Sequence, residues 1–436
     1  MTRAVVLFTR DLRVHDNAAL HAAVDVAAEV VPLFVIDEAV QRRQRSVARE
    51  AFLLESLADL RYALRERGGD LVVRRGDPVD ESVRLARSGG SDFVFVGADA
   101  SGYAQRRQQR LERACRSERI ELRVENTIAV VPAGKLVPAG RDHYRVFTPY
   151  WRRWRETPLP APLPAPGRVT VPAEIARGGL PSPSRSMRGG ERAARRRLDT
   201  WSRGGLRKYE TARYDLGKDG TSRLSPYLHF GCVSATEVAT RAREHGLEAG
   251  EFARQLCWRD FYLQLLAANP QTVTEDLHHR NGAWRFDDDR LAAWAEGRTG
   301  YPIIDAGMRQ LQTEGWMHNR VRLLVGSFLT KTLGIDWRHG ARVFFELLVD
   351  GDVANNVGNW QWVAGTGVDT RPNRFFNPVV QAKRLDPDGE YVRRHVPELA
   401  DLTGSSVHEP WRAPHSARAP EYPGRIVDHE RRAARA

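Results

Sequence analysis

Short apolar runs alternate with amphipathic helical patterns over the first 130 residues, and this alternation constrains the fold more than any other feature of the chain. The apolar runs predict buried strands at Ala4–Phe8, Val30–Ile36, Leu71–Arg74, Phe93–Val96 and Leu122–Val124. The patterns between them predict helices at Ala18–Ala28, Ala48–Arg67, Pro78–Arg87 and Tyr103–Arg119. Such alternation favours a doubly wound parallel sheet. No Gly-x-Gly-x-x-Gly sequence follows the first strand, so the fold alone predicts no dinucleotide.

A proline-rich stretch from Pro158 to Pro183 interrupts this pattern and predicts an extended linker. Beyond it nearly every pattern is helical, with predicted helices at Glu191–Trp201, Ala235–Arg243, Phe252–Ala268, Tyr301–Gln312, Val321–Thr332 and Trp337–Leu348. We therefore expect an α/β domain over residues 1–130, a linker over 131–190 and an all-α domain over 191–436.

Composition excludes several classes of protein. The chain has no run of 18 apolar residues, and its first apolar run is too short for a signal peptide, so neither a membrane span nor secretion is expected. Cys115, Cys232 and Cys257 lie far apart and match no disulfide or zinc pattern, which indicates a reduced, cytoplasmic protein without a metal site. The net charge of +12 makes nucleic acid a candidate partner, although an arginine-rich solvated surface would give the same charge.

The segment Gly315–Trp362 mixes asparagine and tryptophan on predicted helix. Asparagine is a poor residue for a helix interior, and a helical core rarely needs tryptophan at this density. The mixture therefore favours a site for a flat polar ring. Asn319 could meet the edge of such a ring, and the carboxylates of Asp350–Asn356 could accept from ring N–H groups or ribose hydroxyls. Calcium is not predicted at Asp350-Gly351-Asp352, because the other loop ligands are missing.

Other segments allow two interpretations each. Gly220–Pro226 offers hydroxyls and backbone N–H groups that could cradle a phosphate, or it is an ordinary turn before a helix. Trp258 and Arg259 could supply a stacking face and an anion clamp, or a helix that packs one aromatic face. Trp284, Trp337 and Trp360 could form an electron path if the fold aligns them.

Taken in order, these motifs resemble the photolyase/cryptochrome family, and most closely the class I cyclobutane pyrimidine dimer photolyases. The resemblance rests on FTRDLRVHDN, GTSRLSPYLHFG, CWRDFY, GYPIIDAGMRQL, GWMHNRVR, DWRHG, DGDVANNVGNWQW and FNPVVQAKRLDPDGEYVRRHVPEL, and covers nearly the whole chain. It implies a helical domain that holds FAD in a folded form. It also implies light-driven repair of cyclobutane pyrimidine dimers in DNA, in which excited reduced FAD donates an electron to a lesion flipped out of the duplex.

The resemblance also assigns residues. FAD phosphates and ribose would be held by Tyr209, Thr221, Ser222, Arg223, Leu224 and Ser225, and the isoalloxazine region by Asp350, Gly351 and Asp352. Asn356 would face the flavin N5, as in photolyases; plant-type cryptochromes tend to have aspartate there. Photoreduction would run through Trp360, Trp337 and Trp284, from inside to outside. Lesion and DNA would be contacted by Trp258, Trp362, Asn319, Arg320, Arg213, Arg259, Arg322 and Gln381.

Two residues depart from the family pattern. Gln255 stands where cyclobutane-dimer enzymes usually have glutamate, and Leu323 where methionine is usual. Because both would line the lesion pocket, a cryptochrome-like photoreceptor without efficient repair is the alternative function. A helical nucleic-acid-binding scaffold with a degenerate cofactor site is a third hypothesis. A histidine pair near His318 is absent, which favours cyclobutane dimers over (6-4) products.

An antenna chromophore is also implied by the resemblance. The segment between Asp276 and Trp284 is short and lacks the Cys-Lys pair expected for methenyltetrahydrofolate, so 8-hydroxy-5-deazaflavin is the preferred prediction; folate or no antenna are the alternatives. Its candidate contacts are Asp37, Arg49, Asp99 and Arg107, each of which could equally be a surface charge. The chain is expected to act as a monomer on DNA that carries pyrimidine dimers.

Overall fold

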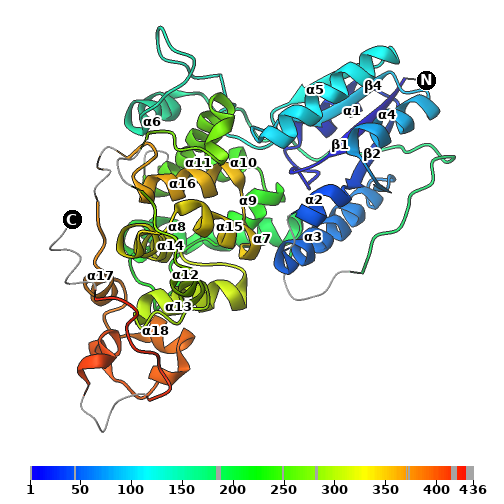
Figure 1. Cartoon of the computed structure of the whole chain (residues 1–436). Helices are drawn as coiled ribbons and strands as arrows, with labels where there is room; N and C mark the ends of the chain where they lie inside the picture. Colours follow the sequence, from blue (N-terminus) through cyan, green and yellow to red (C-terminus); the bar gives the residue numbers. More distant parts are fainter. Residues whose placement is uncertain are drawn as a thin grey trace. The chain divides into compact units, whose positions relative to one another are not determined.

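The structure is a computed structural model that describes residues 2–43, 46–182, 188–247, 250–279, 283–369, 371, 374–413 and 420–428. The chain forms two compact units (Figure 1): Met1–Arg207 with Ser222–Pro270, and Lys208–Thr221 with Gln271–Ala436. These units divide the chain elsewhere than at residues 130 and 190, because helices beyond the proline-rich stretch pack in the same unit as the sheet. The expected domain boundaries stay a prediction. Within the described ranges no helix is both long and apolar enough to cross a membrane.

The first unit contains the predicted parallel sheet. Its strands are β1 (Arg3–Phe8), β2 (Glu29–Ile36), β3 (Val72–Arg75), β4 (Phe93–Gly97) and β5 (Glu121–Glu125), in the order β3-β2-β1-β4-β5. Val5 pairs with Val31 on one side and Val94 on the other, and all three are fully buried. The order reverses at β1 and β4, so the carboxyl ends of these strands form a switch point where ligands of doubly wound sheets usually bind.

Helices cover the sheet and continue beyond it in the first unit. Those along the sheet are α1 (Ala18–Val26), α2 (Glu38–Arg43), α3 (Val47–Arg65), α4 (Pro78–Ser88) and α5 (Gly102–Ser117). Those that follow are α6 (Phe147–Glu156), α7 (Glu191–Thr200), α8 (Leu206–Ala212, which ends in the second unit), α9 (Ser225–Phe230), α10 (Ala235–Glu244) and α11 (Glu251–Ala268), with a π-helical turn at Trp201–Gly205. Helix α6 lies inside the predicted linker, so the expectation of a linker throughout 131–190 missed a helix.

The described part of Pro158–Pro183 has no helix or strand, as predicted, but it is held against the sheet. Thr170 O accepts from Val30 N at 2.8 Å, and Arg177 O accepts from Val73 N at 2.7 Å. Because prolines cannot continue a helix, this segment runs extended and covers backbone groups at the β3 edge.

The second unit is helical around one apolar core. Its helices are α12 (Asp288–Ala295), α13 (Pro302–Glu314), α14 (Asn319–Ser327), α15 (Trp337–Leu347), α16 (Val353–Ala364), α17 (Pro378–Leu385) and α18 (Glu390–His395), with a π-helical turn at Phe328–Leu333 and 3₁₀ turns at Pro270–Val273, Pro397–Leu399, Gly404–His408 and Pro410–Arg412. Trp294, Trp337 and Phe328 are buried in this core with aliphatic side chains from α13 and α14. The parallel sheet and the helical remainder confirm the predicted fold class.

Candidate functional site

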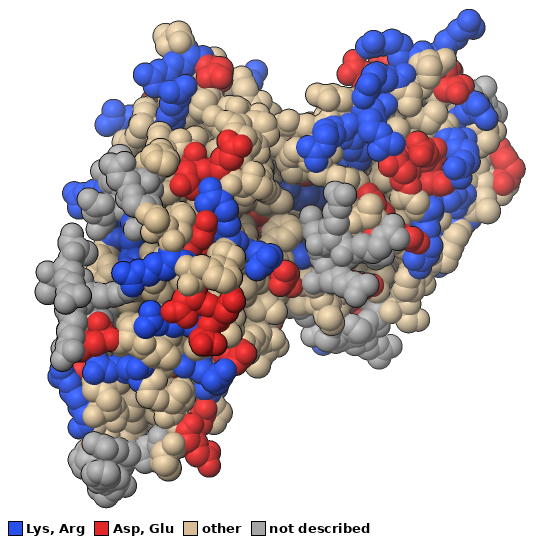
Figure 2. Space-filling model, viewed as in Figure 1, with Lys and Arg blue, Asp and Glu red and all other residues tan. Residues whose placement is uncertain are grey.

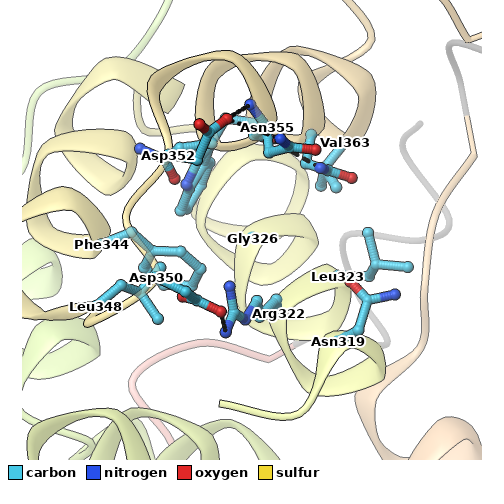
Figure 3. Close-up of a pocket in the computed structure, with 13 residues that line it drawn as sticks. Asn319, Arg322, Leu323, Gly326, Phe344, Leu348, Asp350, Asp352, Asn355 and Val363 are labelled. Atoms are coloured by element: carbon cyan, nitrogen blue, oxygen red, sulfur yellow. Dashed lines mark hydrogen bonds and ion pairs between the residues drawn. The ribbon is translucent and has the colours of Figure 1, made fainter. Parts of the chain in front are cut away.

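A pocket lies among α14, α15 and α16 of the second unit (Figure 3). The lining residues are Asn319, Arg322, Leu323, Gly326, Phe344, Leu348, Asp350, Asp352, Asn355, Asn356, Asn359, Trp360 and Val363. The structure therefore brings six of the predicted site residues together: Asn319, Arg322, Asp350, Asp352, Asn356 and Trp360.

The polar wall of the pocket is fixed by the start of α16. Asp352 caps this helix, and its Oδ1 accepts from Asn355 N at 2.8 Å and Asn355 Nδ2 at 2.7 Å. Asn359 Nδ2 donates to Asn355 O, one turn earlier, at 2.8 Å. Asn356 Nδ2 donates to Ala341 O on α15 at 2.9 Å, which orients its amide. Asparagines that weaken a helix interior are used here to line a site.

Asp350 is the most informative side chain of the pocket. Arg322 Nη2 donates to its Oδ2 at 2.9 Å, and Arg322 Nε donates to Met317 O at 2.8 Å. Figure 3 shows the two side chains facing each other. The other carboxylate oxygen, Oδ1, is buried and has no hydrogen-bond partner among the described residues. A buried oxygen of this kind costs about 1–3 kcal/mol unless a donor meets it, so the pocket fits a ligand with N–H or O–H groups.

The apolar wall is aromatic. Trp360 packs edge-on against Phe344 and Trp294, with ring centroids 5.0 and 6.1 Å away. A Cβ on Gly340 would lie 2.2 Å from Trp360 Cη2, so this position on α15 requires glycine for the indole to be seated. A polar wall opposite buried aromatic rings suits a flat heteroaromatic group.

The predicted electron path keeps its three tryptophans in the second unit. Trp337 is fully buried, and its Nε1 donates to Asp276 Oδ1 at 2.8 Å. Trp284 is partly buried and packs against the same core. The role of these residues stays a prediction. Sequence reasoning missed Asn355 and Asn359, although their spacing of four on one helix, beside Asn356, was a signal.

The predicted phosphate loop shows local strain. A Cβ on Gly220 would lie 2.5 Å from Ala212 Cβ, and Arg223 adopts a left-handed backbone with φ 47°. Thr221 Oγ1 donates to Asp219 Oδ1, and Ser222 O accepts from Arg197 Nε at 2.6 Å. A non-glycine residue with positive φ is uncommon and is often found at ligand sites. Tyr209 lies on α8 and Ser225 begins α9.

Three predicted residues lie on α11 in the first unit: Gln255, Trp258 and Arg259. Phe147 stacks on Trp258 with centroids 3.7 Å apart, so one face of this indole is already covered. The guanidinium of Arg259 donates to Ile128 O and Leu228 O, and its side chain is only 11% exposed. These bonds disfavour the predicted contact of Arg259 with DNA.

Asp260, the next residue, is a buried acid with its own donors. Its carboxylate accepts from Val131 N and Trp154 Nε1, both at 2.8 Å, and from Val130 N at 3.4 Å. Desolvation still raises the pKa of Asp260 to about 6, although Arg259 and these donors oppose the shift. Asp260 thus ties α11 to α6 and to the start of the segment after β5.

The predicted antenna residues lie near the carboxyl ends of the strands. Asp99 follows β4, and its Oδ2 accepts from Arg10 Nη1 at 3.2 Å while Oδ1 accepts from Ser101 N at 2.9 Å. Asp37 follows β2 and accepts from the Tyr103 hydroxyl, over whose ring Arg107 lies at 5.8 Å. Arg49 is buried on α3.

Comparison with known proteins identifies the family. The family model for DNA photolyase matches residues 4–167, and the family model for the FAD binding domain of DNA photolyase matches residues 252–436. The deoxyribodipyrimidine photo-lyase of Streptomyces griseus is 52% identical over 441 residues, which cover 98% of this chain and 97% of that protein. The chain belongs to the DNA photolyase family. The predicted family is thereby confirmed, and the matched FAD-binding domain supports FAD as cofactor. It also counts against a scaffold with a degenerate cofactor site.

Other photolyases agree. The deoxyribodipyrimidine photo-lyase of Escherichia coli is 34% identical, over 99% of this chain and 96% of its own. A bacterial class III photolyase from Agrobacterium tumefaciens superposes with a TM-score of 0.93 at 34% identity, over 100% of this chain and 96% of that one. A cryptochrome from Synechocystis gives 0.92 at 27%, over 100% and 98%. Because the Agrobacterium structure is of class III, it does not support the expected placement in class I.

Proposed function

We propose that this photolyase repairs cyclobutane pyrimidine dimers in DNA, driven by light. The observation that carries the proposal is the buried Oδ1 of Asp350, which has no hydrogen-bond partner among the described residues and lies in a pocket within the matched FAD-binding domain. When bound and reduced, FAD supplies under light the electron that splits the cyclobutane ring. The residues of the chain bind and orient the reacting groups and exclude water.

Asp350, Asp352 and Asn356 would hold the isoalloxazine region. Arg322 keeps the Asp350 carboxylate in place, so that Oδ1 can accept from a ring N–H. Asn356 is oriented by its bond to Ala341 O, which leaves the rest of its amide for the flavin N5. Tyr209 and Thr221–Ser225 would hold the phosphates and ribose.

DNA binding would combine phosphate contacts with a flipped lesion. On the face viewed in Figure 2, basic and acidic side chains are interspersed, so the excess positive charge forms no continuous patch there. The proposed contacts are Arg213, Arg320 and Gln381 for the backbone, and Asn319, Trp258 and Trp362 for the lesion. The relatives named deoxyribodipyrimidine photo-lyase support pyrimidine dimers in DNA as the substrate.

A blue-light photoreceptor without efficient repair is the second candidate. Leu323 lines the pocket, where the family pattern has methionine, and the Synechocystis cryptochrome shares the fold. Gln255 cannot share a proton with a lesion as a glutamic acid could. Gln255→Glu should raise the repair yield if the substrate is the cyclobutane dimer, and the same yield would show that this position does not limit repair.

The antenna proposal is 8-hydroxy-5-deazaflavin near Asp37, Arg49, Asp99 and Arg107, with methenyltetrahydrofolate or no antenna as alternatives. A photolyase from Sulfolobus tokodaii was solved with two FAD molecules. It is 31% identical to this chain, with a TM-score of 0.87 over 100% of this chain and 98% of that one. A second flavin at the switch point is therefore one further alternative. The absorbance spectrum of the pure protein separates these chromophores.

The deciding experiment uses the purified monomeric protein, chemically reduced, with an oligonucleotide that carries one thymine dimer. Blue light should restore the two thymines, and the dark sample should leave the dimer intact. If FAD is bound and photoreduced but no thymine is restored under light, the photoreceptor is the better description. A duplex without a dimer controls for damage by light.

A further inference from the structure

Three arginines surround the ring of Tyr214 in the second unit. The guanidinium carbons of Arg213, Arg320 and Arg384 lie 5.0, 4.4 and 5.4 Å from its centroid. All three distances are within the roughly 6 Å over which a cation is attracted to an aromatic face. Arg213 Nη2 also donates to the Tyr214 hydroxyl at 3.1 Å. One phenol ring thus contacts cations from three separate parts of the chain.

The ring is held where these parts meet. Arg213 and Tyr214 follow α8, Arg320 lies in the first turn of α14, and Arg384 lies in the last turn of α17. Leu216 N donates to Leu385 O at 2.9 Å, which joins the Tyr214 segment to the end of α17. Tyr214 itself is partly buried against the core of the second unit. The ring is therefore held by the core and the backbone and not only by the arginines.

Three positive charges meet at this ring. Because all three guanidinium groups lie close to one ring, their separations do not much exceed the Debye length of about 10 Å. The groups therefore repel one another. The ring offsets part of this repulsion, since each exposed cation–π contact contributes about 0.5–1 kcal/mol. Duplex DNA carries one negative charge per about 1.7 Å of its axis and can meet several guanidinium groups at once. Arginine is the residue best suited to phosphate, because its planar fork binds two oxygens.

We propose that Tyr214 is a positioning residue that gathers Arg213, Arg320 and Arg384 into one phosphate-binding cluster for DNA. The inference rests on the proposed function, which supplies DNA as the binding partner. It adds Tyr214 as the residue that holds the DNA-binding arginines together. Gln381, a predicted DNA contact, precedes Arg384 by three residues on α17 and so lies on the same side of that helix.

The test measures binding of undamaged duplex DNA in the dark by the FAD-loaded protein, over a series of salt concentrations. Tyr214→Leu should weaken binding about 5- to 20-fold near 0.1 M salt and lower the slope of log K against log salt by about 1–2, because one or two phosphate contacts are lost. Tyr214→Phe keeps the ring and should stay within about twofold of the parent. Tyr62→Leu removes a similar pair in the first unit, where Arg192 lies 4.1 Å over Tyr62, and serves as the matched control. FAD content and thermal melting confirm that each variant is folded.

A salt slope unchanged in Tyr214→Leu overturns the proposal, as does an equal loss in Tyr62→Leu. An equal loss in Tyr214→Phe would assign the effect to the hydroxyl and overturn the role of the ring. Repair of a dimer-bearing duplex is measured in parallel. If the parent repairs and the slope does not respond, only the Tyr214 inference fails; if the slope responds but no repair occurs, only the proposed function fails. A parent that binds no DNA overturns both.

Discussion

The helical pocket and the edge of the sheet each contain an aspartate–arginine pair, and the two pairs are similarly buried. In the pocket, Asp350 and Arg322 are 2.9 Å apart with side chains 3% and 22% exposed. At the sheet, Asp99 and Arg10 are 3.2 Å apart with side chains 7% and 20% exposed. Both oxygens of Asp99 accept hydrogen bonds from the chain, whereas Oδ1 of Asp350 accepts none among the described residues. Burial and pairing are therefore common to the two pairs, and the unmet oxygen is what distinguishes Asp350.

The same difference applies to Asp37, although Arg107 Nε, in the same predicted set, is buried without a hydrogen-bond partner among the described residues. Asp37 is bonded to Tyr103 and to backbone N–H groups, so a chromophore at the sheet edge has to displace bonds that already exist. A flavin in the helical pocket displaces no donor from Asp350. We therefore expect the pocket to be the stronger site and the sheet edge the weaker one.

Asp350→Ala should have the largest effect. It removes the charged acceptor for a ring N–H, and a hydrogen bond to a charged group contributes about 1.5–3 kcal/mol, so FAD affinity should fall about 10- to 100-fold. Asp99→Ala breaks a pair of similar burial and should change FAD affinity less than about twofold. Flavin absorbance per folded protein measures both. Equal flavin retention in the two variants would break the comparison.

Asp260→Asn should have the next largest effect, on stability and not on flavin. Because burial raises the pKa of Asp260 from 3.8 to about 6, the folded chain holds this proton more tightly than the unfolded chain. Its contribution to stability is fully present below about pH 4 and is lost as the pH rises through about 6, by about 2–3 kcal/mol. The difference in unfolding free energy between parent and variant should follow this curve. A difference that does not vary with pH would show that Asp260 has the same pKa in the folded and the unfolded chain.

The sequence predicted the fold because its signals were local. A strand that is buried on both faces is a continuous apolar run, and such a run at Val30–Ile36 predicted a strand there. The structure has β2 at Glu29–Ile36. Helix α6 was missed although its buried apolar residues, Phe147, Tyr150 and Trp154, recur at the spacing of an amphipathic helix, because it directly precedes the proline-rich stretch and was included in the linker. These residues pack against α11, which is distant in sequence.

The candidate site was predicted in part for the same reason. Asn319, Asp350, Asp352 and Asn356 came from motifs within one stretch, and they do line one pocket. One oxygen of Asp350 has no donor among the described residues because of the position of Arg322. No sequence motif predicts that position. The placement of Arg259 also depends on carbonyls of Ile128 and Leu228, far away in the chain, so its predicted DNA contact could not be weighed from sequence.

Trp360→Phe sharpens the comparison within the pocket. It should slow photoreduction of oxidised FAD at least about tenfold, because phenylalanine is much harder to oxidise, while repair by chemically reduced enzyme stays nearly intact. Trp294→Phe is the matched control, since this indole lies 6.1 Å from Trp360 but donates to Val325 O and is outside the predicted path. Flash photolysis follows both variants. Slow photoreduction in Trp294→Phe alone would move the path away from Trp337.

Tyr103→Phe should have the smallest effect and tests the sheet edge directly. Without the Tyr103 hydroxyl, Asp37 is available to an incoming chromophore that no longer has to displace a hydrogen bond worth about 0.5–1.5 kcal/mol. Affinity for 8-hydroxy-5-deazaflavin, measured by fluorescence titration of FAD-loaded protein, should therefore rise about threefold, with FAD content unchanged. Weaker binding would make Tyr103 itself a contact of the antenna. Unchanged binding would place the antenna away from Asp37.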